Sequence, residues 1–122
     1  MATHLKMLVV DDEPALRQSL FNQFTDEGFV VEMANDGDVA LDMIKNNHYD
    51  IVLLDLNMPR MNGMTALIEM TKLDRYPHVV VLTIVDDAAK AIECVKLGAS
   101  DYLTKPYDPE ELLHVVIKVL SS

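Results

Sequence analysis

Short apolar runs alternate with longer amphipathic stretches along the whole chain, and this alternation strongly limits the folds available to it. The apolar runs are rich in Val, Leu and Ile and lack a polar face, which is typical of strands covered on both sides of a parallel sheet. Three strong runs occupy residues 7–10, 51–54 and 79–82, and two weaker ones occupy residues 30–34 and 102–103. We therefore predict five strands.

The stretches between these runs carry apolar residues at helical spacing. Five helices are predicted, beginning near residues 14, 36, 63, 86 and 109. Pro14 and Pro109 suit a first helical turn, while Gly28 and Gly98 suit helix ends. The residues expected to face the core are, in chain order, Leu16, Leu20 and Phe24; Ala40 and Ile44; Met64, Leu67, Ile68 and Thr71; Ala88, Ile92 and Val95; and Leu113, Val116, Ile117 and Leu120.

Five β/α units in strict alternation predict an α/β protein, with a five-stranded parallel sheet and helices on both faces. The flavodoxin-like, doubly wound strand order is the one expected for five such units. The chain has 122 residues, half of them apolar, which is enough for a full core. We expect one domain over residues 1–122, with about 5–120 structured.

Charge and composition exclude several classes of function. The 20 acidic and 10 basic residues give a net charge of -10, which repels nucleic acid and anionic membranes. The apolar runs are too short to span a membrane, and no signal peptide is recognisable, so we expect a soluble, cytoplasmic protein. The single Cys94 excludes a disulfide framework and a cysteine zinc site. The four histidines are scattered along the chain and are expected to be surface residues.

Polar residues follow four of the predicted strands, at the edge where this fold binds ligands. Asp11, Asp12 and Glu13 follow the first strand, and Asp55 follows the third. Thr83 and the pair Lys105-Pro106 follow the last two. Three crowded carboxylates favour a cation, and oxygen ligands suit Mg²⁺. With a lysine able to hold a phosphoryl oxygen, the group predicts a phosphoryl-transfer site with a carboxylate nucleophile.

Each of these groups also has a purely structural interpretation. Asp12 or Glu13 can cap the helix that begins at Pro14. Asp55 can cap or turn the chain, although a carboxylate directly after four apolar residues is costly to bury unpaired. Thr83 can be an ordinary residue at the end of a strand, and Lys105 can be an ordinary surface lysine. Their joint occurrence at successive strand ends favours the functional interpretation.

Four sequence blocks resemble the response-regulator receiver domains of two-component signalling, including the single-domain chemotaxis regulators. The resemblance extends from Leu8 to Leu120. The blocks are Val9-Val10-Asp11-Asp12-Glu13-Pro14, Asp55-Leu56-Asn57-Met58-Pro59-Arg60-Met61-Asn62-Gly63, Leu82-Thr83, and Gly98-Ala99-Ser100-Asp101-Tyr102-Leu103-Thr104-Lys105-Pro106.

The resemblance implies a role for each site residue. Asp55 is expected to accept a phosphoryl group from a histidine kinase or a phosphotransfer protein. Asp11, Asp12 and Asp55, with the backbone carbonyl of Asn57, are expected to hold Mg²⁺, or Mn²⁺ in its place. Lys105 is expected to pair with Asp55 or with the phosphoryl group, and the peptide bond before Pro106 is expected to be cis.

The resemblance also implies a conformational switch. Thr83 is expected to move toward the phosphoryl group, and Tyr102 to turn into the vacated space. The face formed by the fourth helix, the fifth strand and the fifth helix would then control an output domain or partner protein, or form a phosphorylation-dependent homodimer. Ile84 departs from the family, which more often has Ala or Gly after the threonine, and its bulk is expected to narrow the pocket.

Three other interpretations compete with a phosphorylated receiver. An aspartyl phosphatase of the haloacid-dehalogenase type would also use an aspartate and Mg²⁺, but Asp55-Leu56-Asn57 lacks its second acid and the chain has no room for a cap. A flavin-binding electron carrier of the same fold would need a phosphate-binding loop after the first strand, but Asp11, Asp12 and Glu13 occupy that position. A receiver-like scaffold that works without phosphorylation remains open. A true enzyme is not expected.

Overall fold

The computed structural model describes residues 4–58 and 61–122. Pro59 and Arg60 of the second block, and residues 1–3 of the predicted domain, lie outside the described residues. The elements are β1 (Lys6–Val10), α1 (Pro14–Asp26), β2 (Val30–Ala34), α2 (Gly37–Asn46), β3 (Ile51–Asp55), β4 (Asn57–Met58), β5 (Met61–Asn62), α3 (Gly63–Thr71), β6 (His78–Ile84), a 3₁₀ turn (Val85–Asp87), α4 (Ala88–Leu97), β7 (Asp101–Lys105) and α5 (Pro109–Leu120).

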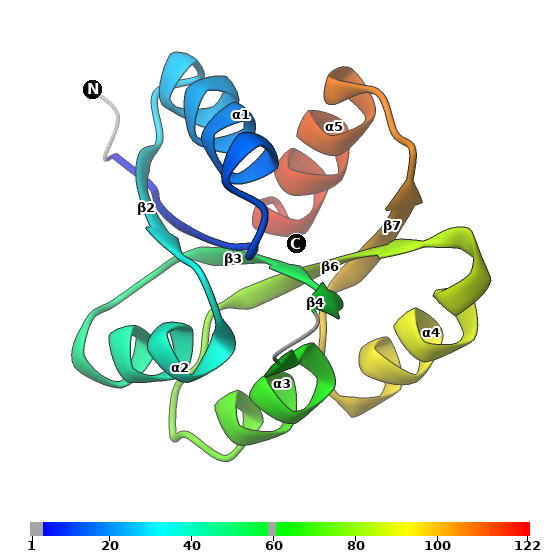
Figure 1. The fold of residues 1–122 in the computed structure, drawn as a ribbon. Coiled ribbons are helices and arrows are strands. Elements are labelled where there is room, and N and C mark those ends of the chain that lie inside the picture. Colours follow the sequence, from blue (N-terminus) through cyan, green and yellow to red (C-terminus); the bar gives the residue numbers. More distant parts are fainter. Residues whose placement is uncertain (1–3, 59–60) are drawn as a thin grey trace.

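The main sheet is parallel, with the strand order β2-β1-β3-β6-β7. Helices α1 and α5 cover one face of this sheet, and α2, α3 and α4 cover the other (Figure 1). Successive strand residues point to opposite faces, so in β3 Ile51 and Leu53 pack under α1 and α5 while Val52 and Leu54 pack under the other helices. The predicted five strands, their doubly wound order and the three-layer arrangement are confirmed.

Strands β4 and β5 form a short antiparallel pair after β3, which the sequence analysis did not predict. Each strand has only two residues. An alternating pattern needs about four residues to be recognised, so a ladder this short has no periodic signal.

The predicted core faces of α1 and α2 are close to the observed ones, with Leu20, Phe24, Ala40 and Ile44 buried. The predicted core faces of the last three helices are partly wrong: Leu67 of α3 and Val116 of α5 are buried as predicted, whereas Ile92 and Val95 of α4 are exposed. The buried residues are Ala66, Leu67 and Met70 in α3, Ala91 and Cys94 in α4, and Leu112, Val116 and Val119 in α5.

The shift has a physical reason in α4. This helix carries two apolar stripes, and the smaller residues Ala91 and Cys94 allow it to lie close to the sheet. The larger Ile92 and Val95 are left exposed, as is Ile117 on α5. The helix also begins at Ala88 rather than near Asp86, because a 3₁₀ turn fills residues 85–87.

Candidate functional site

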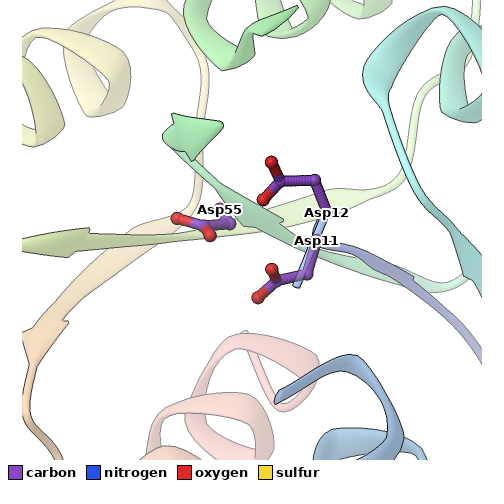
Figure 2. A group of neighbouring side chains, drawn as sticks. All are labelled: Asp11, Asp12 and Asp55. Atoms are coloured by element: carbon purple, nitrogen blue, oxygen red, sulfur yellow. The ribbon is translucent and has the colours of Figure 1, made fainter. Parts of the chain in front are cut away.

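Three aspartates lie together at the carboxyl edge of the sheet. β1 and β3 are hydrogen-bonded neighbours, with Val10 opposite Leu54, so Asp11 and Asp55 emerge side by side (Figure 2). One carboxylate oxygen from each of Asp11, Asp12 and Asp55 lies within 4.8 Å of the others. Asp11 and Asp55 are buried, whereas Asp12 is partly exposed. The doubly wound order thus brings together acids that are 44 residues apart.

Burial and crowding change the acidity of this group. Burial is the main cause that raises the pKa of Asp11 to about 6, and the neighbouring charge of Asp55 adds to it. The hydrogen bond from the backbone N–H of Glu13 to Asp11 Oδ1, 2.9 Å long, opposes the rise. Ionising Asp11 within this group of acids therefore costs free energy.

The two acids after Asp11 do not cap α1 with their side chains. Glu13 occupies the N-cap position and makes no side-chain cap hydrogen bond. The guanidinium of Arg17 instead donates to the backbone carbonyl of Asp11 over 2.8 Å, which fixes the turn between β1 and α1. The capping interpretation of Glu13 is wrong, and Asp12 is left free to face the pocket.

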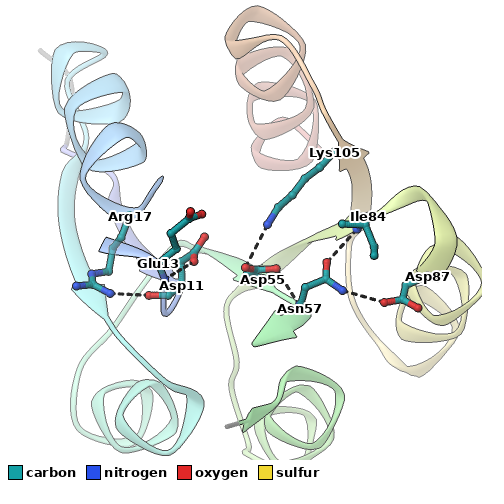
Figure 3. Close-up of polar contacts among 8 residues, drawn as sticks. All are labelled: Asp11, Glu13, Arg17, Asp55, Asn57, Ile84, Asp87 and Lys105. Atoms are coloured by element: carbon teal, nitrogen blue, oxygen red, sulfur yellow. Dashed lines mark hydrogen bonds and ion pairs between the residues drawn. The ribbon is translucent and has the colours of Figure 1, made fainter. Parts of the chain in front are cut away.

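Lys105 reaches the pocket from the end of β7. Its Nζ lies 3.2 Å from Asp55 Oδ2 (Figure 3), and the peptide bond between Lys105 and Pro106 is cis. The other oxygen of Asp55 accepts a 2.9 Å hydrogen bond from the backbone N–H of Asn57. Both oxygens of the buried Asp55 therefore have a donor, and the carboxylate is held in one orientation.

The side chain of Asn57 joins two loops at the mouth of the pocket. Its Oδ1 accepts a hydrogen bond from the backbone N–H of Ile84 at 2.9 Å, and its Nδ2 donates to Asp87 Oδ2 at 2.8 Å (Figure 3). The sequence analysis gave Asn57 only a backbone role. It missed this side-chain bridge and Asp87, because contacts 27 and 30 residues apart leave no local pattern.

Thr83 and Tyr102 lie on neighbouring strands. Thr83 is fully buried at the end of β6, where it pairs in register with Thr104 of β7. Tyr102 pairs with Val81 and packs, partly buried, against the core on the α4 side. Ile84, the next residue after Thr83, is exposed.

Three buried polar atoms have no hydrogen-bond partner among the described residues: Asp11 Oδ2, Thr83 Oγ1 and Tyr107 Oη. Burial, together with the charges of Asp11 and Asp55, raises the pKa of Tyr107 to about 12. An unpaired buried carboxylate oxygen costs stability unless a ligand satisfies it. The free oxygen of Asp11, beside two more carboxylates, therefore fits a hard cation with oxygen ligands such as Mg²⁺.

The fold and the site define a doubly wound α/β protein with an acidic, lysine-bearing pocket at the carboxyl edge of its sheet. The sequence model of the family described as "response regulator receiver domain" matches residues 7–117. The chain belongs to this family. Receiver domains are signalling modules of two-component systems, and accepting a phosphoryl group is their general function.

Named relatives agree with this assignment. The chain is 37% identical to the regulatory protein AtoC of Escherichia coli (strain K12) over 115 residues, which cover 94% of this chain and 25% of AtoC. It is 40% identical to the response regulator MprA of Mycobacterium sp. (strain KMS) over 109 residues, which cover 89% of this chain and 47% of MprA. The chain thus spans less than half the length of these relatives.

Solved structures match over nearly the whole chain. The chemotaxis response regulator CheY4 of Vibrio cholerae is 32% identical, with a TM-score of 0.88 over 96% of this chain and 99% of that one. The receiver domain of NtrX from Brucella abortus is 29% identical, with a TM-score of 0.89 over 95% and 98%. In the part of the chain that the structure describes, no helix has the length and hydropathy needed to cross a membrane.

Proposed function

We propose that Asp55 accepts a phosphoryl group from the phosphohistidine of a histidine kinase or phosphotransfer protein. The observation that carries this proposal is the setting of Asp55: it is buried at the end of β3, between two further aspartates and the ammonium group of Lys105. A carboxylate oxygen of Asp55 attacks phosphorus, the P–N bond breaks, and an acyl phosphate forms while the imidazole retains its electron pair.

Asp11, Asp12 and Asp55, with the backbone carbonyl of Asn57, would hold Mg²⁺. When bound, the ion supplies positive charge that neutralises the phosphoryl oxygens and the acids themselves. Lys105 forms an ion pair with Asp55, and after phosphorylation it would pair with a phosphoryl oxygen instead. A lysine ammonium can do this because it carries three N–H donors on a flexible side chain. The free oxygen of Asp11 supports this ligand set.

The test is the intact mass of the protein after exposure to acetyl phosphate, with and without Mg²⁺. We expect one labile phosphoryl adduct that needs Mg²⁺ and is absent in Asp55→Asn. The matched control is Asp38→Asn, which removes an exposed acid from the first turn of α2. If acetyl phosphate gives no adduct, transfer from a phosphorylated histidine kinase is measured next. No adduct from either donor would contradict the proposal and favour a scaffold that works without phosphorylation.

We further propose that the phosphoryl group switches the face formed by α4, β7 and α5. The hydroxyl of Thr83 is buried and lacks a partner, so a phosphoryl oxygen on Asp55 would give it one. Movement of Thr83 would leave space for the ring of Tyr102, which is only partly buried. The exposed side chains of Ile92, Val95 and Ile117 give this face an apolar surface for an output domain, a partner protein or a second copy of the chain.

Thr83→Ala separates the switch from the chemistry. We expect the variant to form the adduct on Asp55 while the NMR shifts of α4, β7 and α5 stay close to those of the unmodified protein. The wild type should show shift changes over the whole face on phosphorylation. Equal changes in wild type and variant would remove Thr83 from the switch.

A further inference from the structure

Asp87 occupies the N-cap position of α4 but does not cap the helix with its side chain. An aspartate at this position commonly accepts a hydrogen bond from a backbone N–H of the first helical turn. The carboxylate of Asp87 makes no such bond within α4, all of whose residues the structure describes. Its Oδ2 instead accepts a 2.8 Å hydrogen bond from Nδ2 of Asn57, 30 residues earlier in the chain (Figure 3). The side chain therefore serves the loop after β3 rather than its own helix.

This contact selects the orientation of the Asn57 amide. A carboxylate can only accept a hydrogen bond, and a backbone N–H can only donate one. Asp87 therefore holds the amide nitrogen, while the N–H of Ile84, 2.9 Å from Oδ1, holds the amide oxygen. A half-turn of the amide would set donor against donor and acceptor against acceptor. The side chain of Asn57 is thus held in one orientation from both ends.

The anchored side chain holds the backbone of Asn57 where it meets the aspartates. The backbone N–H of Asn57 donates a 2.9 Å hydrogen bond to Asp55 Oδ1. Its backbone carbonyl is one of the proposed Mg²⁺ ligands. A continuous chain of contacts therefore runs from Asp87 through Asn57 to the carboxylate that would accept the phosphoryl group.

We propose that Asp87 is a positioning residue of the phosphorylation site and acts through Asn57. The inference rests on the proposed function, because Asp55 and the Asn57 carbonyl are the groups that Asp87 orients. Among the described residues, the acids with oxygens within 4.8 Å of one another are Asp11, Asp12 and Asp55, so Asp87 supports this group from outside it. Outer contacts of this kind commonly change metal affinity about 10- to 100-fold when they are removed.

The other neighbour of Asp87 provides a matched control. Oδ1 of Asp87 lies 3.9 Å from Nζ of Lys90, whose side chain is 65% exposed. An ion pair this long and this exposed contributes little to stability. Because Lys90 and Asn57 contact different oxygens of Asp87, the two contacts can be removed separately. Lys90→Ala removes the ion pair and leaves the contact with Asn57 in place.

The first experiment measures amide hydrogen exchange at the Asn57 N–H by NMR, with EDTA present. We expect exchange about fivefold faster in Asp87→Ala, since the loss of one anchor loosens the loop. Asp87→Asn removes the charge but keeps an oxygen that can accept from Asn57, so it should exchange at the wild-type rate, as should Lys90→Ala. This experiment needs neither Mg²⁺ nor phosphorylation, so its outcome is independent of the proposed function.

The second experiment measures Mg²⁺ affinity by calorimetry. We expect it to fall about tenfold in Asp87→Ala and to stay at the wild-type value in Asp87→Asn and Lys90→Ala. Asp87 is partly exposed, so the variants are expected to fold, and their melting temperatures check this.

Three results would overturn the proposal. The first is equal exchange at Asn57 in the wild type and Asp87→Ala. The second is a wild type that binds Mg²⁺ no more tightly than Asp87→Ala does. The third is an Asp87→Asn protein as impaired as Asp87→Ala, which would assign the effect to charge instead of the contact with Asn57. A wild type that binds no Mg²⁺ would contradict the proposed metal ligands, and exchange at Asn57 would then decide the role of Asp87.

Discussion

At the scale of single residues, the folded protein disfavours the ionised form of Asp11. Its pKa is about 6 in the folded chain and 3.8 in the unfolded reference. The native state therefore binds more protons than the unfolded state between these values, and the stability of the metal-free protein falls as pH rises from about 4 to about 6. Above pH 6 the full cost of the buried charge is present.

Asp11→Asn is expected to stabilise the metal-free protein at pH 7 by about 1–3 kcal/mol, because it removes a buried charge next to Asp55. The free energy of unfolding in urea, measured with EDTA, checks this. Asp86→Asn removes an exposed acid of the 3₁₀ turn and should change stability little. An Asp11→Asn protein less stable than wild type at pH 7 would show that the carboxylate is well compensated.

Ile84 is expected to slow the reaction of Asp55 with small phosphodonors. It follows the buried Thr83 at the mouth of the pocket, and its backbone N–H is held by Asn57. We predict that Ile84→Ala increases the rate of phosphorylation by acetyl phosphate about three- to tenfold, a barrier lowered by about 0.7–1.4 kcal/mol. The rate of mass gain measures it, with Ile117→Ala, an exposed isoleucine on α5, as control. Unchanged rates would show that the exposed side chain of Ile84 leaves the path clear.

At the scale of elements, the sequence predicted the strands and helices well, because continuous apolar runs are easily distinguished from apolar residues at helical spacing. The faces of the last three helices were less predictable. In α4, Ala91-Cys94 and Ile92-Val95 are both apolar at helical spacing, so hydrophobicity alone cannot select the buried stripe. The close approach of α4 to the sheet selects the smaller residues, Ala91 and Cys94. This approach depends on packing between distant parts of the chain.

This assignment of the α4 face predicts opposite responses at adjacent positions. Ala91→Leu should lower the free energy of unfolding by about 1–3 kcal/mol, because Ala91 has no exposed surface and the added atoms have no space. Ile92→Ser should change it by no more than about 0.5 kcal/mol, since Ile92 is exposed. Urea unfolding of both variants measures this. A larger loss of stability in Ile92→Ser than in Ala91→Leu would mean that Ile92 and Val95 face the core, as the sequence predicted.

The bridge made by Asn57 predicts the mobility of the junction between β6 and α4. Asn57→Ala removes the acceptor for the Ile84 N–H and the donor for Asp87. We expect amide hydrogen exchange at Ile84 to become about fivefold faster, corresponding to the loss of a hydrogen bond worth about 1 kcal/mol. Asp87→Ala removes only one of the two contacts and should give a smaller increase. Equal protection of Ile84 in wild type and Asn57→Ala would mean that the backbone alone orders this junction.

At the scale of the whole molecule, the strand order decides where the charged groups meet. The predicted topology was sufficient to place Asp11, Asp55 and Lys105 at one edge, because parallel strands all end there. It was not sufficient to place Asp87 beside Asn57, because Asp87 lies 30 residues further along the chain and does not directly follow a predicted strand. Residues at a shared edge are predictable when the sequence marks them as unusual for a strand end.

Because the fold holds three carboxylates within 4.8 Å, a cation should stabilise the whole molecule as well as assist its chemistry. At tenfold its dissociation constant, a ligand that binds only the native state adds about 1.4 kcal/mol. For a domain of this size that corresponds to a rise of about 5 °C in melting temperature. We expect Mg²⁺ to produce this rise at pH 7, and EDTA to reverse it.

NaCl at equal ionic strength is the control, because screening by salt lacks the direct ligand bonds of a bound ion. Asp11→Asn should lose most of the effect of Mg²⁺, since it removes a charged ligand. The same rise with NaCl, or an undiminished rise in Asp11→Asn, would mean that Mg²⁺ acts on the general negative charge of the chain instead of at the three aspartates.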